Sequence, residues 1–138
     1  MGMRYLGIDY GRARIGLALS DTEGCIAFPQ GTLRVVAGKG GELGALKDIV
    51  RVIKKEKVGA IVIGLPLTHD GGETEESECV RTFTKLLGEK IAVPIVFENE
   101  MFSSRMAEDG AGDKSTLDAS VAAIILQSYL DKHKKHRT

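Results

Sequence analysis

The sequence carries no net charge and lacks the patterns that mark zinc-thiolate and nucleophile-dependent enzymes. It has 19 Lys and Arg against 19 Asp and Glu, so bulk charge does not announce a nucleic-acid partner and any basic face must be local. The two cysteines, Cys25 and Cys79, show neither CxxC spacing nor metal-binding neighbours, which predicts reduced thiols in a cytoplasmic protein. No obvious Ser/His/Asp or Cys/His set is present for nucleophilic catalysis.

Long apolar runs are also missing, and their absence argues against a membrane or secreted location. No run approaches the roughly 20 residues of a membrane-spanning helix, and the N-terminus lacks the charged start and apolar core of a secretion signal. We therefore expect a cytoplasmic protein without a membrane partner. The 43% of hydrophobic residues suffices for a real core, and 138 residues suit one domain over 1–138. The basic residues 132–138 are typical of a frayed, solvated tail.

Hydrophobic patterns divide the chain into strands and helices of the α/β class. Strands are expected at 4–9, 13–20, 26–36, 58–64 and 94–97, and helices at 43–55, 74–87, a short segment from 103 or 104 to about 110, and about 116–132. Short connections predict antiparallel pairing of the first three strands, whereas helix–strand alternation predicts parallel strands afterwards. Pro29 indicates a bend or a sheet edge, and Gly16 indicates either a close backbone approach or a bulge.

Three carboxylates stand at the ends of core elements, where folding alone would not favour them. Asp9 ends an apolar strand, Glu100 follows another, and Asp118 lies on the apolar face of the last helix. Ligands of open α/β sheets bind outside the carboxyl ends of parallel strands, so Asp9 and Glu100 are expected at one edge. We therefore predict that the three acids meet at a single site.

The chemistry of such a site follows from its charge. Carboxylates brought close together repel one another, and burial further disfavours their ionised forms, so a divalent cation relieves both penalties. All-oxygen ligation favours Mg²⁺ or Mn²⁺ over zinc. Mg²⁺ held by few carboxylates usually serves phosphate chemistry, in which it activates water and stabilises the departing oxygen. The acids Asp9, Glu100 and Asp118 are therefore candidate metal ligands of a phosphodiester hydrolase.

Each candidate residue also has a purely structural interpretation. Asp9 could satisfy the amides of the following turn, residues 115–118 fit a helix capping box, and Glu100 could be exposed after an edge strand. Arg12 and Arg14 flank the first turn and could clamp phosphate, although surface arginines are usually just solvated. The joint occurrence of the three acids favours the functional interpretation.

Three motifs together resemble the YqgF (RuvX) family, in order and over nearly the whole chain. They are Gly7-Ile8-Asp9-Tyr10-Gly11 followed by Arg14-Ile15-Gly16-Leu17-Ala18, Ile63-Gly64-Leu65-Pro66-Leu67 with Asp70-Gly71, and the closing run from Asp118 to Leu130. The resemblance implies an RNase H-like fold related to RuvC Holliday junction resolvases. It implies a five-stranded mixed sheet of order 3-2-1-4-5 with helices on both faces. It also implies that Asp9, Glu100 and Asp118 are catalytic.

The resemblance further implies a substrate. Members of the family are described as candidate resolvases and as nucleases that mature the 5′ end of pre-16S rRNA. We therefore expect a metal-dependent nuclease acting on precursor rRNA or branched DNA, with Arg12, Arg14 and Lys114 contacting the backbone. A resolvase would need two active sites, which a homodimer would supply.

Two departures from the family pattern leave other hypotheses open. The family usually has Asp-Glu-Arg where this chain has Asn99-Glu100-Met101, and the loop at 109–114 is short and nearly without positive charge. Both differences weaken phosphate contacts, so a catalytically weak nucleic-acid or ribosome-assembly binder is the alternative. An actin-like or sugar-kinase-type ATPase fragment also begins with such a turn, but those enzymes close two domains around the nucleotide.

Overall fold

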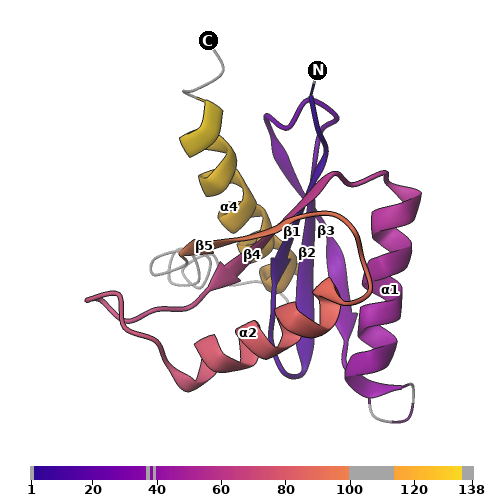
Figure 1. Ribbon diagram of the computed structural model, residues 1–138, viewed down its shortest axis with the longest axis vertical. Coiled ribbons are helices and arrows are strands. Elements are labelled where there is room, and N and C mark those ends of the chain that lie inside the picture. Colours follow the sequence, from indigo (N-terminus) through magenta and orange to yellow (C-terminus); the bar gives the residue numbers. More distant parts are fainter. Residues whose placement is uncertain (1, 37, 39, 100–113, 135–138) are drawn as a thin grey trace.

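A five-stranded sheet with helices on both faces forms the framework of the protein (Figure 1). The computed structural model describes residues 2–36, 38, 40–99 and 114–134. The strands are β1 (Tyr5–Asp9), β2 (Arg14–Ser20), β3 (Ala27–Arg34), β4 (Ala60–Leu65) and β5 (Ile95–Asn99), and the helices are α1 (Gly41–Lys55), α2 (Glu75–Gly88) and α4 (Lys114–Lys134). The expected elements among these residues are confirmed, whereas the short helix expected near 103–110 lies outside them.

The strand order β3-β2-β1-β4-β5 is the order that the family resemblance implies, and it places β1 at the centre. The pairs β1–β2 and β2–β3 are antiparallel, while β1–β4 and β4–β5 are parallel, as the connection lengths predicted. Pro29 lies on the edge strand β3, opposite a register shift between Leu17 and Ala18, which confirms the predicted edge.

One face of the sheet packs against α1 and α2. Alternate residues of the central strands, among them Leu6, Ile8 and Ile63, are fully buried on this face because successive side chains of a strand point to opposite sides. Helix α1 contributes the apolar stripe predicted from its spacing, which includes Leu46 and Ile49. Helix α2 begins at a capping box formed by Thr74 and Ser77, which satisfies its first amides.

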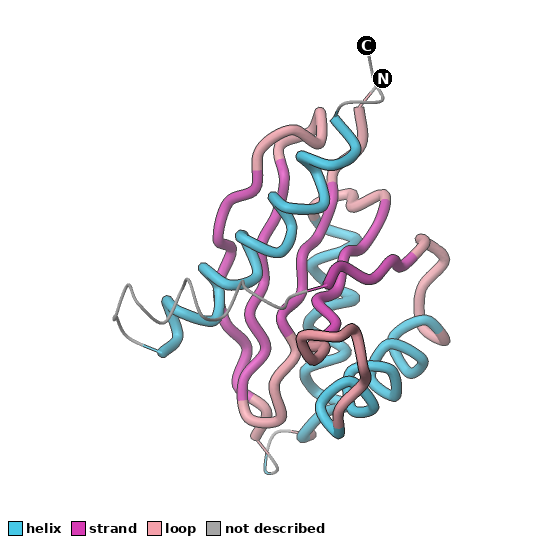
Figure 2. The backbone as a smooth tube through the Cα atoms, turned by 90° about the vertical axis from the view of Figure 1, so that its left-hand side faces the viewer, coloured by secondary structure: helices cyan, strands magenta, loops and turns pink. Residues whose placement is uncertain are grey.

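Within the described residues, the helix that covers the opposite face is α4, which crosses the strands in Figure 2. The apolar residues of this second cluster are Ala18, Val62, Val121, Ala122, Ile125, Leu126 and Leu130. Helix α4 approaches the sheet closely because the strands present glycines. A Cβ at Gly7 would lie 2.8 Å from the Cβ of Leu126, and one at Gly16 would lie 2.0 Å from the carbonyl oxygen of Asp118. The predicted close approach at Gly16 is therefore confirmed.

Polar contacts fasten α4 to both edges of the sheet. At β3, the side-chain carbonyl of Gln127 accepts a hydrogen bond from the Ala27 amide at 2.8 Å. At β5, the buried carboxylate of Glu98 accepts bonds from Ser128 at 2.8 Å and Lys132 at 2.6 Å. Among the helices within the described ranges, none combines the length and apolar content that a membrane crossing requires.

Replacing Gly16 by alanine should lower the free energy of unfolding by about 2 kcal/mol, because the new methyl group would overlap the backbone of α4. Chemical denaturation of the two proteins measures the difference. The matched control is Gly88→Ala, where the nearest atom to the added methyl lies at 3.9 Å, and its stability should stay near that of the parent. Equal stability of both variants would show that α4 does not rest on Gly16.

Candidate functional site

Asp9 ends the central strand and faces the α4 side of the sheet. Within β1, Leu6 and Ile8 belong to the core beneath α1 and α2, whereas Gly7 lies against α4. Because side chains alternate along a strand, Asp9 shares the face of Gly7. The residue is partly buried at the carboxyl end of β1, next to the parallel strand β4. A carboxylate is thus presented at the edge where open α/β sheets bind ligands.

Asp118 reaches the same face through the close approach of α4. In the antiparallel ladder Asp9 pairs with Gly16, so their Cα atoms lie roughly 5 Å apart. The position that a Cβ of Gly16 would take is already occupied by the backbone carbonyl of Asp118. The first turns of α4 therefore lie directly over the strand residue beside Asp9. The structure brings these two predicted acids to one region of one face.

Arg14 forms an ion pair with Asp118. Its Nε donates to Oδ2 of Asp118 at 2.6 Å, with 33% of the arginine side chain and 19% of the aspartate side chain exposed. Arg14 opens β2 on the α4 face, two residues before Gly16, so the alternation of the strand directs it toward α4. The predicted phosphate ligand Arg14 is thus bound to a predicted metal ligand in this structure.

Two other predicted site residues, Glu100 and Lys114, lie beyond the side chains that the structure describes. Glu100 directly follows β5 but lies outside the described residues, and Lys114 opens α4 without a described side chain. Within the described ranges, no three His, Cys, Asp or Glu side chains gather as a metal site would require. Of the three predicted metal ligands, the structure therefore describes Asp9 and Asp118.

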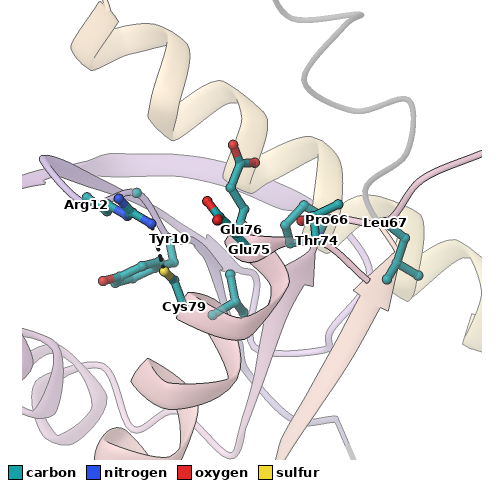
Figure 3. A pocket seen from close by; sticks show the side chains of 10 residues that line it. Tyr10, Arg12, Pro66, Leu67, Thr74, Glu75, Glu76 and Cys79 are labelled. Carbon is teal, nitrogen blue, oxygen red and sulfur yellow. Dashed lines mark hydrogen bonds between the residues drawn. The ribbon is translucent and has the colours of Figure 1, made fainter. Parts of the chain in front are cut away.

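Arg12 lies elsewhere, at a cavity of about 850 Å³ between the β1–β2 connection and the start of α2 (Figure 3). Its Nη2 donates to the Sγ of Cys79 at 3.3 Å. The cavity is lined by Tyr10, Gly11, Arg12, Pro66, Leu67, Thr74, Glu75, Glu76, Cys79 and Val80. Sequence reasoning missed this cavity. Because side chains alternate along a strand, Tyr10 must face the opposite side of the sheet from Asp9. This alternation could have indicated a second surface at the end of β1, where the cavity lies.

Tyr10 is held firmly at the wall of this cavity. Its hydroxyl donates to Oε2 of Glu42 at 2.8 Å, and its ring lies 4.5 Å from that of Phe83. Burial, followed by the hydrogen bond and negative charge of Glu42, raises the pKa of Tyr10 to about 12. The end of β1 therefore presents an acid on one face and a neutral, packed phenol on the other.

Comparison with known proteins assigns the family. A family profile described as RuvX, Holliday junction resolvase, matches residues 3–132. The chain belongs to the RuvX family. A protein of Nitratidesulfovibrio vulgaris (strain DSM 19637 / Miyazaki F), provisionally named a pre-16S rRNA nuclease, is 36% identical to this RuvX-family chain over 144 residues, covering 99% of both. A protein of Anaeromyxobacter sp. (strain Fw109-5) with the same provisional name is 39% identical, covering 94% of this chain and 97% of its own.

Solved structures support the RNase H-like fold that the RuvX resemblance implies. The RuvC of T. thermophilus in complex with a Holliday junction matches with a TM-score of 0.64 at 13% identity, covering 96% of both chains. The yeast mitochondrial Holliday junction resolvase matches with a TM-score of 0.60 at 10% identity, covering 99% of this chain and 82% of its own. At such low identity the likeness establishes the architecture alone.

The raised pKa of Tyr10 predicts a pH dependence of stability. Between pH 10 and 12 the unfolded chain releases this proton while the folded chain retains it, so stability should fall as pH rises through this window. Tyrosinate absorbance of the parent minus that of Tyr10→Phe isolates this group from the other two tyrosines. In Glu42→Gln the pKa should move only part of the way toward 10, because the burial remains. A difference spectrum that titrates near 10 in the parent would contradict the described packing.

Proposed function

We propose that this protein is a metal-dependent nuclease, a single domain over residues 1–138, that hydrolyses phosphodiester bonds in structured nucleic acid. The observation that carries the proposal is the convergence of Asp9 and Asp118 on one face, at the carboxyl end of the central strand, in a chain of the RuvX family. Precursor 16S rRNA is the leading substrate because full-length relatives carry that provisional name. Branched DNA is the second substrate, favoured by the description of the family.

The donor set fits a hard divalent cation. Asp9 and Asp118 offer carboxylate oxygens, Glu100 would add a third carboxylate from the end of β5, and Asp118 already holds a cationic group in Arg14. We therefore assign Asp9, Glu100 and Asp118 as the ligands of Mg²⁺ or Mn²⁺. Such an ion, when bound, polarises the phosphate oxygens and lowers the pKa of a coordinated water.

Cationic side chains would bind the substrate and position it for cleavage. Arg14 and Lys114 would bind backbone phosphates beside the acids, and Arg12 would bind a phosphate of the same substrate on the side of the cavity, since arginine matches phosphate through paired N–H donors. We place this reaction in the cytoplasm. Two-strand cleavage of a junction would require a homodimer, whereas trimming of precursor rRNA would not, so the native mass of the protein bears on the substrate.

Substituting the acids should remove cleavage while leaving the fold intact. We expect Asp9→Asn and Asp118→Asn to lower the cleavage rate at least about 100-fold in Mg²⁺, because each removes a negative charge from the cation site. The assay uses a precursor 16S rRNA with its 5′ extension and, separately, a four-way DNA junction. Asp48→Asn is the matched control, since Asp48 pairs with Arg51 on the exposed surface of α1.

The outcomes separate enzyme from binder. Equal cleavage by the parent and both acid variants would mean that the activity comes from a contaminant. Tight RNA binding by the parent without cleavage in Mg²⁺ or Mn²⁺ would instead favour the alternative of a binding protein with this fold. Cleavage of one substrate alone would assign RNA or DNA as the target.

Arg12 should contribute to substrate affinity rather than to the chemical step. We expect Arg12→Ala to weaken nucleic-acid binding and to reduce the slope of log affinity against log salt by about 1, as loss of one phosphate contact requires. Binding is measured in Ca²⁺ across a salt series. Arg51→Ala removes an equal charge from the exposed surface of α1 and should leave both the affinity and the slope unchanged. An unchanged slope in Arg12→Ala would remove this residue from the interface.

A further inference from the structure

Arg14 forms an ion pair with Asp118, the carboxylate that the proposed mechanism assigns as a metal ligand. We infer that Arg14 is an exchangeable counter-cation, which neutralises Asp118 in the metal-free protein and releases it when a divalent cation binds. The released guanidinium would then be available to a backbone phosphate. This inference rests on the proposed function and adds to it an order of events, in which metal binding frees a substrate-binding group.

The backbone explains why Arg14 and Asp118 meet. Gly16 lets the first turns of α4 settle onto β2, and Arg14 lies two residues earlier on the same face. The contact at 2.6 Å between Nε and Oδ2 is a charge-assisted hydrogen bond. A carboxylate with 19% of its side chain exposed would otherwise lie partly desolvated without a countercharge. Arg14 therefore supplies the positive charge that this position requires.

The exposure of both partners, the acid included, indicates that the pair of Arg14 and Asp118 can open. One third of the Arg14 side chain is exposed, and Nε donates its hydrogen bond to Asp118. The pair of Glu98 and Lys132 offers a contrast within the same fold. There the carboxylate is only 6% exposed and also accepts a bond from Ser128, so the acid is locked into the core. Both cations reach solvent, Lys132 at 60% and Arg14 at 33%, so the contrast lies in the acids: Asp118 is 19% exposed, and among the described residues its side-chain partner is Arg14.

Electrostatics favours replacement of Arg14 by the metal ion at Asp118 over simultaneous binding of both cations. A divalent cation on the oxygens of Asp118 would lie within a few ångströms of the guanidinium, and charges of the same sign at that distance repel strongly outside bulk water. The dication also attracts the carboxylate more strongly than a single positive charge does. The competing interpretation is that Arg14 stays bound and positions Asp118 while the second oxygen binds the metal. The two interpretations predict opposite effects of removing Arg14.

Calorimetric titration with the metal alone shows whether removing Arg14 strengthens or weakens metal binding. We expect metal-stripped Arg14→Gln to bind Mn²⁺ or Mg²⁺ roughly threefold to tenfold more tightly than the parent, because the competing cation is gone. Arg14→Lys keeps the charge and should lie between them. Arg51→Gln removes a remote charge and should match the parent. Weaker binding by Arg14→Gln would overturn the exchange in favour of a positioning role.

Nitrogen-15 NMR of the arginine Nε–H groups provides a readout that activity does not influence. The Arg14 signal, assigned by its loss in Arg14→Lys, should carry the shift of a carboxylate-bound donor in the metal-free protein. It should move toward the solvent-exposed position as Mg²⁺ saturates the site. A signal that keeps its bound shift at saturation would overturn the inference. Circular dichroism of each variant confirms that it is folded before either measurement is read.

The binding measurements also distinguish failure of the Arg14 exchange from failure of the proposed metal-dependent function. If the parent binds metal and Asp118→Asn does not, while Arg14→Gln binds no more tightly than the parent, the exchange fails and the metal site stands. If neither the parent nor Arg14→Gln binds a divalent cation, the metal-dependent function fails and the exchange fails with it. Tighter binding by Arg14→Gln together with a displaced Nε signal supports both.

Discussion

The packing of α4 on the sheet depends on a missing Cβ atom at Gly16. The carbonyl of Asp118 occupies that position, and the apolar face of α4 beyond it buries Val121, Ile125 and Leu126 against the strands. Each such large side chain stabilises the fold by roughly 1.5–3 kcal/mol when fully buried. A side chain at Gly16 would lift the start of α4, so one contact determines both the second core and the place of an acid beside Asp9.

The two-residue period of a strand separates two kinds of surface at the end of β1. Asp9 faces α4, whereas Tyr10 faces Phe83 and α2. The arginines of the following turn divide in the same way, because Arg14 pairs with Asp118 while Arg12 reaches Cys79 at the cavity. Residues that are neighbours in the sequence therefore contribute to different surfaces. In the proposed nuclease, the acids act from one face and the cavity lies on the other.

The sequence was most informative where the governing interactions are local. Strands and helices followed from apolar periodicity, and the spacing of Asp118 with Val121 and Ile125 placed the acid on the face that packs. The strand order came from the family resemblance, since periodicity does not specify which strands pair. The partner of Arg14 lies 104 positions away along the chain and depends on how α4 docks. The side on which Tyr10 lies follows from strand alternation, whereas the cavity around Arg12 also depends on how the start of α2 packs beside the β1–β2 connection.

A chain without net charge must bind a polyanion through local cations, and the ion pair of Arg14 and Asp118 bears directly on that problem. Before metal binds, the pair is neutral and offers phosphate little attraction. After exchange the carboxylate would be neutralised by the dication, and the site would gain the free charge of Arg14. The attraction for nucleic acid would thus rise where cleavage is to occur. Metal and substrate would then bind with positive coupling, since each favours the state in which Arg14 has left Asp118.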